Sequence, residues 1–170
     1  MPLNLKRSDI RKIRGRKLFD FGRHPGTFVL ETARGMIEMS RQYRPTQVRR
    51  SMSYGAWTSE FCVVRLAGKR RCGHTTAALH LLAENPESVY LCPSNKHLDS
   101  AVERALRMKF VAPASTILAC TSDELRGLSH RVLDLVIVDP ASYTEDFALQ
   151  SIIVRFGPVL SPRGVILFLG

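Results

Sequence analysis

From residue 61 onward, short apolar runs alternate with amphipathic stretches. The amphipathic spacing predicts helices at 75–84, 95–108 and 145–156. The apolar runs predict β-strands at 61–66, 88–92, 115–120, 133–138 and 164–169. Because strands and helices alternate, we expect βαβ units. The predicted fold is therefore α/β, with a mainly parallel sheet of about five strands flanked by helices.

The first 60 residues carry a different pattern. Apolar positions spaced three and four apart predict a helix over 28–42, capped by Thr27, and a second helix over 46–54. Trp57 is interpreted as a core or interface residue rather than a base-stacking platform. At 170 residues and 45% apolar content, the chain fits a single domain. We divide it into a basic, helical N-terminal arm, a helical lead-in and an α/β core, at 1–24, 25–60 and 61–170.

The charge balance indicates that the protein has a binding partner. Twenty-five Lys and Arg against fifteen Asp and Glu give a net charge of +10. Such an excess indicates a polyanionic partner, most commonly nucleic acid. The arm concentrates basic residues that we expect to follow a DNA or RNA backbone, although a solvated tail explains them equally well. These residues are Lys6, Arg7, Arg11, Lys12, Arg14, Arg16 and Lys17.

Cysteine usage and hydropathy indicate the compartment. The four cysteines are isolated, without metal-ligand spacing, so neither a zinc site nor a disulfide framework is predicted. No apolar run reaches the roughly 18 residues of a membrane span. We expect a soluble, cytoplasmic protein with no membrane partner.

Residues 61–82, FCVVRLAGKRRCGHTTAALHLL, contain the strongest candidate site. They predict a buried strand, a turn rich in Gly and Arg, and a helix that opens at Thr75-Thr76. Backbone N–H groups converge at such a helix start, and the helix dipole favours an anion. Gly68 and Gly73, followed by His74 and Thr75, match G-x-x-x-x-G-K-[ST] except at the lysine. The turn from Gly68 to Gly73, called the glycine turn below, is thus predicted to bind phosphate.

A second candidate feature is Asp139, which follows the apolar run 133–138 directly. An acid at the carboxyl end of a buried parallel strand lies at the edge where open α/β folds bind ligands. In phosphate-loop proteins such an acid holds Mg²⁺ together with a hydroxyl from the turn. Thr75 is placed to supply that hydroxyl.

The order of these segments resembles the ATPase core of phage large terminases and related helicase-type P-loop translocases. The segments that carry the resemblance are LAGKRRCGHTT, VYLCPSNKHLDSA, SDELRGLSHRVLDLVIVDPASY and GPVLSPRGVILFLG. It implies a P-loop NTPase-like fold that binds ATP with Mg²⁺, a phage or phage-like origin, and a protein partner in a DNA-processing complex. Asp139 and Arg70 would be catalytic, Thr75 and Asp139 would hold the metal, and Gln47 would read adenine. The implied nucleotide contacts are Gln47, Gly68, Lys69, Arg70, Arg71, Gly73, His74, Thr75 and Thr76.

Two departures from that family's pattern predict a degenerate site. His74 replaces the phosphate-binding lysine, and an imidazole lacks the permanent charge of an ammonium group. Pro140 stands where the family has the glutamate that orients the attacking water, and proline has no side chain for base chemistry. We therefore expect nucleotide binding with weak or no hydrolysis.

Two other functions remain open. S-adenosylmethionine-dependent methyltransferases also have a strand followed by a Gly-rich turn, and an Asp-Pro pair after a buried strand, as at Asp139-Pro140. Against this, the strand ending at Cys92 lacks an acid for the cofactor ribose. The second alternative is a non-catalytic binding or inhibitory module that acts on a nucleic-acid-processing partner.

Overall fold

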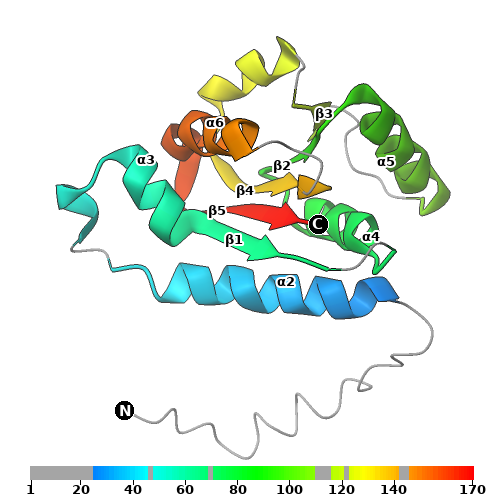
Figure 1. Cartoon of the computed structure of the whole chain (residues 1–170), viewed down its shortest axis with the longest axis horizontal. Coiled ribbons are helices and arrows are strands. Elements are labelled where there is room, and N and C mark those ends of the chain that lie inside the picture. The colour runs from blue at the N-terminus through cyan, green and yellow to red at the C-terminus, as the bar shows by residue number, and fades with distance from the viewer. Residues whose placement is uncertain (1–24, 46–47, 69–70, 110–115, 121–122, 142–145) are drawn as a thin grey trace, which may run out of the picture.

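The computed structural model describes residues 25–45, 48–68, 71–109, 116–120, 123–141 and 146–170. Within these ranges, five strands form one sheet in the order β1-β5-β4-β2-β3 (Figure 1). Every neighbouring pair is parallel, which confirms the predicted α/β class and parallel sheet. The strands are β1 Val63–Leu66, β2 Ser88–Cys92, β3 Ile117–Ala119, β4 Leu133–Val138 and β5 Leu160–Leu169.

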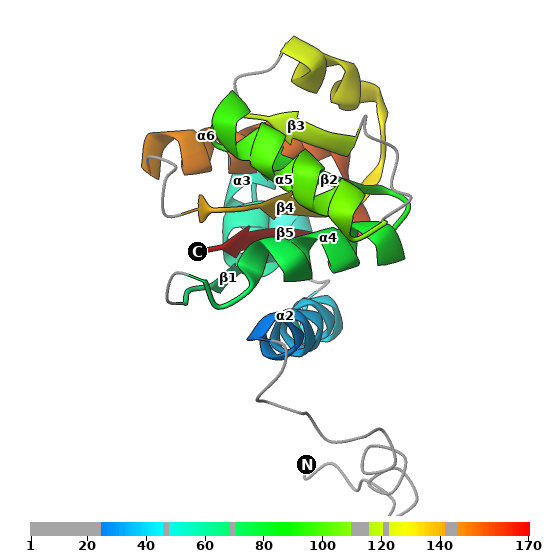
Figure 2. The ribbon, with the colours of Figure 1, turned by 90° about the vertical axis from the view of Figure 1, so that its right-hand side faces the viewer.

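Helices cover both faces of the sheet (Figure 2). The longer ones are α2 Pro25–Gln42, α4 His74–Glu84, α5 Asn95–Arg107 and α6 Asp146–Phe156. The shorter ones are η1 Val48–Ser51, α3 Tyr54–Trp57, η2 Thr58–Cys62, η4 Asp123–His130 and η6 Gly157–Val159. None of the described helices combines the length and apolarity that crossing a membrane requires.

Two hydrophobic clusters fill the space between sheet and helices. On β4, Leu135 and Ile137 belong to the cluster under α2, α4 and α5. Val136 and Val138 alternate with them and belong to the cluster under α6 and η4. All five residues of β2 are buried. Because both faces of these parallel strands are covered, the strands are nearly continuously apolar, which is why they were recognisable in the sequence.

The lead-in helix α2 belongs to the same core as the α/β region. Its residues Val29, Leu30, Ala33 and Ile37 are buried in one cluster with residues of α4 and the sheet. Their three- and four-residue spacing is that of one helix face, as the sequence pattern predicts. Figures 1 and 2 show α2 lying alongside α4.

The predicted second helix over 46–54 is wrong. Within the described part of that region, a 3₁₀ turn (η1) is followed by a separate helix that begins at Tyr54. The side chain of Ser53 accepts a hydrogen bond from the Ala56 backbone N–H. This bond caps a new helix that begins at Tyr54, the residue at which the predicted helix ended. Helical structure then continues through Cys62, so β1 begins at Val63 rather than at residue 61.

Two smaller predictions also differ from the structure. Thr27 lies inside α2, which begins at Pro25, a residue favoured at the first helical position because its missing N–H costs nothing there. The last strand begins at Leu160 rather than at Gly164. Its first part bulges, since Leu133 pairs with Leu160 while Leu135 pairs with Val165.

Candidate functional site

The site lies at the carboxyl edge of the sheet, to which β1, β4 and β5 all point (Figure 1). β5 separates β1 from β4. The chain leaves β1 for α4, which packs on one face, and leaves β4 for α6, which packs on the other. Open α/β sheets bind their ligands where neighbouring connections diverge in this way.

Two described residues of the glycine turn have a positive φ. Gly73 has φ 96° and Arg71 has φ 66°, both in the left-handed region. A Cβ on Gly68 would lie 2.8 Å from His74 Nε2 and 2.9 Å from Cys72 Sγ, so the imidazole and the thiol pack directly against this glycine. Cys72 Sγ and His74 Nε2 are themselves 3.2 Å apart. The imidazole of His74, which replaces the expected lysine, therefore packs against the start of the turn at Gly68.

The next residue joins the turn to the acid on β4. Thr75 Oγ1 donates a hydrogen bond of 2.8 Å to Asp139 Oδ2. The hydroxyl of Tyr90, from β2, donates to the same oxygen at 2.7 Å. The Asp139 backbone N–H donates to Leu91 O at 3.1 Å, which fixes the acid beside β2. One carboxylate thus joins the end of β4 to β2 and to the first turn of α4.

Burial dominates the electrostatics of this cluster. Asp139 is only 1% exposed, and burial raises the pKa of its carboxyl above the usual value. The hydrogen bonds from Tyr90 and Thr75 oppose that rise because they stabilise the ionised form. Burial also raises the pKa of the Tyr90 hydroxyl well above its ordinary value, with the nearby Asp139 charge adding to the effect. The tyrosine therefore stays a hydrogen-bond donor at neutral pH.

The pair Thr75 and Asp139 has the chemistry to hold a hard cation. Both supply oxygen, the ligand atom that Mg²⁺ prefers. The Tyr90 hydroxyl shares the carboxylate oxygen that Thr75 contacts, so a cation there would compete with two hydroxyl donors. In the described part of the chain, no group of three or more His, Cys, Asp or Glu side chains is arranged to hold a metal.

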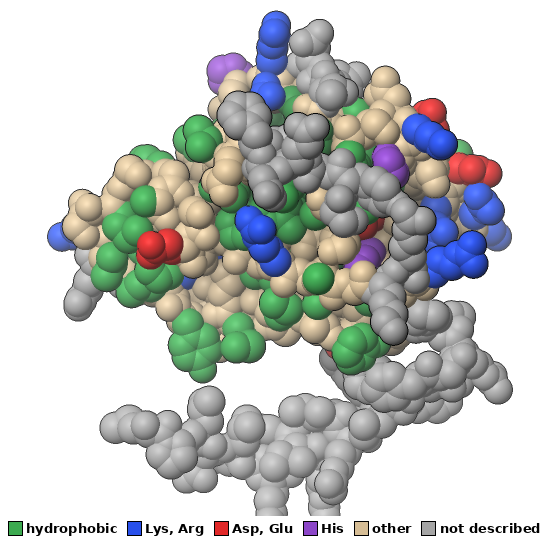
Figure 3. Space-filling view, in the orientation of Figure 1, with side chains coloured by type: hydrophobic (Ala, Val, Ile, Leu, Met, Phe, Trp, Pro, Cys, Tyr) green, Lys and Arg blue, Asp and Glu red, His purple; other side chains and the backbone are tan. Residues whose placement is uncertain are grey.

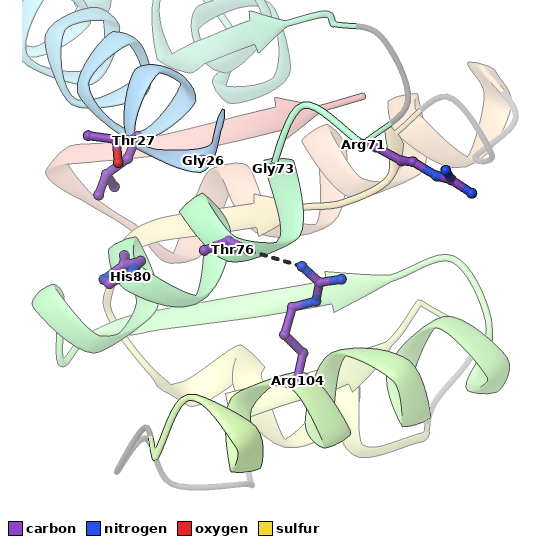
Figure 4. Close-up of a pocket in the computed structure, with 8 residues that line it drawn as sticks. Gly26, Thr27, Arg71, Gly73, Thr76, His80 and Arg104 are labelled. Carbon is purple, nitrogen blue, oxygen red and sulfur yellow. Dashed lines mark hydrogen bonds between the residues drawn. The ribbon is translucent and has the colours of Figure 1, made fainter. Parts of the chain in front are cut away.

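The remaining described residues of the turn face elsewhere. Thr76 points to the outer side of α4, where its hydroxyl accepts a 3.1 Å hydrogen bond from Arg104 Nη1 (Figure 4). The Arg71 side chain extends away from Thr76 at the far end of the turn in the same view. The peptide bond between Asp139 and Pro140 is cis. Of the predicted site residues, Thr75 and Asp139 are hydrogen-bonded and, with Tyr90, form what we call the inner cluster. Gly68 and His74 pack against each other in the turn, while Arg71, Gly73 and Thr76 line a cavity on its outer side.

Several predicted site residues lie outside the described residues. They include the adenine-reading Gln47 and two cations of the turn, Lys69 and Arg70. The basic arm also lies outside, with Lys6, Arg7, Arg11, Lys12, Arg14, Arg16 and Lys17.

Two residues of the site carry no motif and were missed in the sequence. Tyr90 is the one tyrosine in the apolar run of β2, and its position two residues before Cys92 at the strand end places its hydroxyl near that edge. Arg104 lies on α5, 28 residues beyond the threonine that it contacts. A polar atom inside an otherwise apolar strand is the signal that identifies Tyr90, because such an atom needs a buried partner. Arg104 has no comparable signal.

Comparison of the chain with protein-family models finds no match, and a search of the curated proteins finds none either. The geometry of the site therefore carries the functional argument.

Proposed function

We propose that this chain is a degenerate P-loop ATPase-like domain that binds a nucleotide through its phosphates at the glycine turn, with weak or no hydrolysis. The observation that supports this most is the hydrogen bond between Thr75 and Asp139, which are 64 positions apart. The turn hydroxyl and the strand-end acid are the two groups that a phosphate loop needs beside each other. Their contact agrees with the resemblance to terminase and helicase-type ATPases.

The turn also has the electrostatics that an anion requires. α4 begins at His74, and its first turn contains no acidic residue. Its unpaired N–H groups and the positive end of its dipole favour a phosphate at that point. When Mg²⁺ accompanies the nucleotide it neutralises phosphate charge, and Thr75 Oγ1 and Asp139 would be its protein ligands.

Residues of the same site favour slow hydrolysis of the nucleotide. Pro140 follows Asp139 and offers no group to orient a water molecule. The carboxylate of Asp139 already accepts hydrogen bonds from Thr75 and Tyr90. The permanent cation of the family pattern is replaced at position 74 by an imidazole that packs on Gly68. Binding without efficient turnover is the function that this combination favours.

The net charge of +10 supports a nucleic-acid partner in addition to the nucleotide. More than half of that excess comes from the arm at 1–24. A role inside a DNA-processing complex, with a protein partner, is consistent with the terminase-like order of segments. Salt dependence of DNA or RNA binding tests this part, because phosphate contacts release counterions and affinity then falls steeply with salt.

The test of the nucleotide site is a calorimetric titration with Mg·ATP. We expect Thr75→Val to weaken binding by about tenfold or more, since a hydrogen bond to a charged group contributes about 1.5–3 kcal/mol. Thr75→Ser keeps the hydroxyl and should bind as the wild type does. Thr58→Val is the control, because it makes the same substitution at a threonine that lies in η2, away from the turn.

Equal affinity of Thr75→Val and wild type for Mg·ATP would refute the proposed site. Failure of the wild type to bind at millimolar Mg·ATP would do the same. If S-adenosylmethionine bound in its place, the methyltransferase-like alternative would be favoured.

A further inference from the structure

A cavity lies on the outer side of the glycine turn, between α2, α4 and α5 (Figure 4). We call it the outer pocket, and its volume is about 460 Å³. Leu30 of α2 supplies an apolar wall, while His80 and Thr76 of α4 and Arg104 of α5 supply polar ones. A cavity of this size falls within the range of small-molecule sites.

The start of α2 forms one end of this pocket. Gly26 and Thr27 line it, and both lie in the first turn of an 18-residue helix, where backbone N–H groups have no partner within the helix. A Cβ on Gly26 would lie 3.2 Å from Thr76 Cβ and 3.3 Å from Gly73 O, so the start of α2 packs closely on the start of α4. The amino-terminal ends of two helices, both with positive partial charge, therefore meet at the pocket.

The side chains around the pocket carry charge of the same sign. Arg104 brings its guanidinium to Thr76, and Arg71 lies at the rim. Among the described residues, no Asp or Glu lines the pocket and neither arginine forms an ion pair. Figure 3 shows Lys and Arg side chains, with acidic side chains beside them, at the right-hand end of the molecule where α5 lies. Arginine binds phosphate oxygens through paired N–H groups, and helix starts bind the same anions.

We propose that the outer pocket binds the phosphate group of a small phosphorylated molecule, with Arg104 and the α2 amides at Gly26 and Thr27 holding the phosphate. The apolar wall at Leu30 gives the rest of the molecule a surface to pack on, which inorganic phosphate alone would not use. The inner cluster of Thr75, Asp139 and Tyr90 does not line the outer pocket, although three of the predicted nucleotide contacts, Arg71, Gly73 and Thr76, do. Arg104 and the α2 residues Gly26 and Thr27 belong to the outer pocket alone, so they can be tested separately from the nucleotide site.

The experiment is a set of calorimetric titrations of the full chain with AMP, inorganic phosphate and adenosine, at low salt. We expect AMP to bind most tightly, phosphate more weakly, and adenosine not measurably. Arg104→Ala should weaken AMP binding about tenfold or more, as expected for loss of a charge-assisted hydrogen bond. Arg107→Ala is the matched control, because Arg107 lies one turn further along α5, pairs with Glu103 and does not line the pocket.

Three results would overturn this inference. They are the same AMP affinity in Arg104→Ala and Arg107→Ala, no response of the wild type to AMP or phosphate at millimolar concentration, and adenosine binding as tightly as AMP. A lack of effect of Arg104→Ala on AMP refutes only the outer pocket. A lack of effect of Thr75→Val on Mg·ATP refutes only the inner site, so the two failures are distinguishable.

Discussion

At the scale of single residues, Asp139 is the group on which most of the site depends. Its carboxylate is buried, accepts two hydroxyl donors, and connects the ends of β2 and β4 to the first turn of α4. A buried carboxylate is costly unless it is hydrogen-bonded. Thr75 and Tyr90 reduce that cost, yet the pKa of Asp139 remains raised because the effect of burial is larger.

The raised pKa of Asp139 predicts a pH-dependent stability. Below the ordinary value of 3.8 the group is protonated in both folded and unfolded chains and contributes no difference. As pH rises above 3.8, the unfolded chain releases this proton first, so the contribution of Asp139 to folding stability falls until the folded pKa is passed. Asp139→Asn removes this term. Urea denaturation from pH 3.5 to 7 should therefore find the variant gaining stability relative to wild type as pH rises, and a constant difference would contradict the assignment.

The sequence predicted part of this cluster and not the rest. Thr75 and Asp139 were expected together because each belongs to a motif whose partner sits at the same sheet edge. Tyr90 was not expected, since its hydroxyl reaches Asp139 only because β2 pairs directly with β4. Strand adjacency of that kind depends on long-range packing and leaves no local pattern.

At the scale of elements, the contact between α2 and the beginning of β5 organises the end of the sheet opposite the site. Arg44 Nη1 donates to Pro162 O at 3.0 Å and Nη2 donates to Gly164 O at 2.6 Å, while Arg41 Nε donates to Arg163 O at 3.1 Å. The carbonyls that these arginines contact belong to the bulge in β5, where the backbone is not paired with β4. The carbonyls of the bulge thus accept hydrogen bonds from Arg41, in the last turn of α2, and from Arg44, just beyond that helix.

Gly164 closes this bulge and is predicted to resist substitution. A Cβ there would lie 2.7 Å from Leu133 O and 2.9 Å from Ser161 N, and both are backbone atoms that cannot easily move. We expect Gly164→Ala to lower the free energy of unfolding by about 1–3 kcal/mol, measured by urea denaturation.

Gly35→Ala provides the opposite control for Gly164. Gly35 lies in the exposed face of α2, and a Cβ there meets nothing within 4 Å. Replacing a helix-interior glycine with alanine should raise stability by about 0.5–1 kcal/mol. An equal effect of the two substitutions would contradict the close packing described for the bulge.

Element predictions succeeded where apolar periodicity is strong and failed where local capping decides. The predicted strand 133–138 and helix 95–108 agree with β4 and α5 to within a residue because both have clear hydrophobic patterns. The predicted helix over 46–54 was wrong because one side-chain hydrogen bond, accepted by Ser53, starts a new helix at Tyr54. The prediction missed the first residues of β5 because Ser161–Gly164 form a bulge and have no apolar pattern.

At the scale of the whole molecule, the strand order brings distant parts of the sequence to one edge. β1 and β5, the first and last strands of the described chain, are neighbours, and β5 separates β1 from β4. The glycine turn after β1 and the acid after β4 therefore flank the carboxyl end of β5. The hydrophobic pattern predicted strands and their direction but contains no information on this order.

Amide NMR of the labelled protein during titration with Mg·ATP tests most directly whether the glycine turn is an anion site. We predict the largest chemical-shift changes at the amides of Gly73, His74 and Thr75, with Asp139 also affected through its hydrogen bond to Thr75. Saturation of these shifts at one common affinity would support one binding event at the glycine turn. Changes confined to α5 or to the basic arm, or none at millimolar Mg·ATP, would contradict the account.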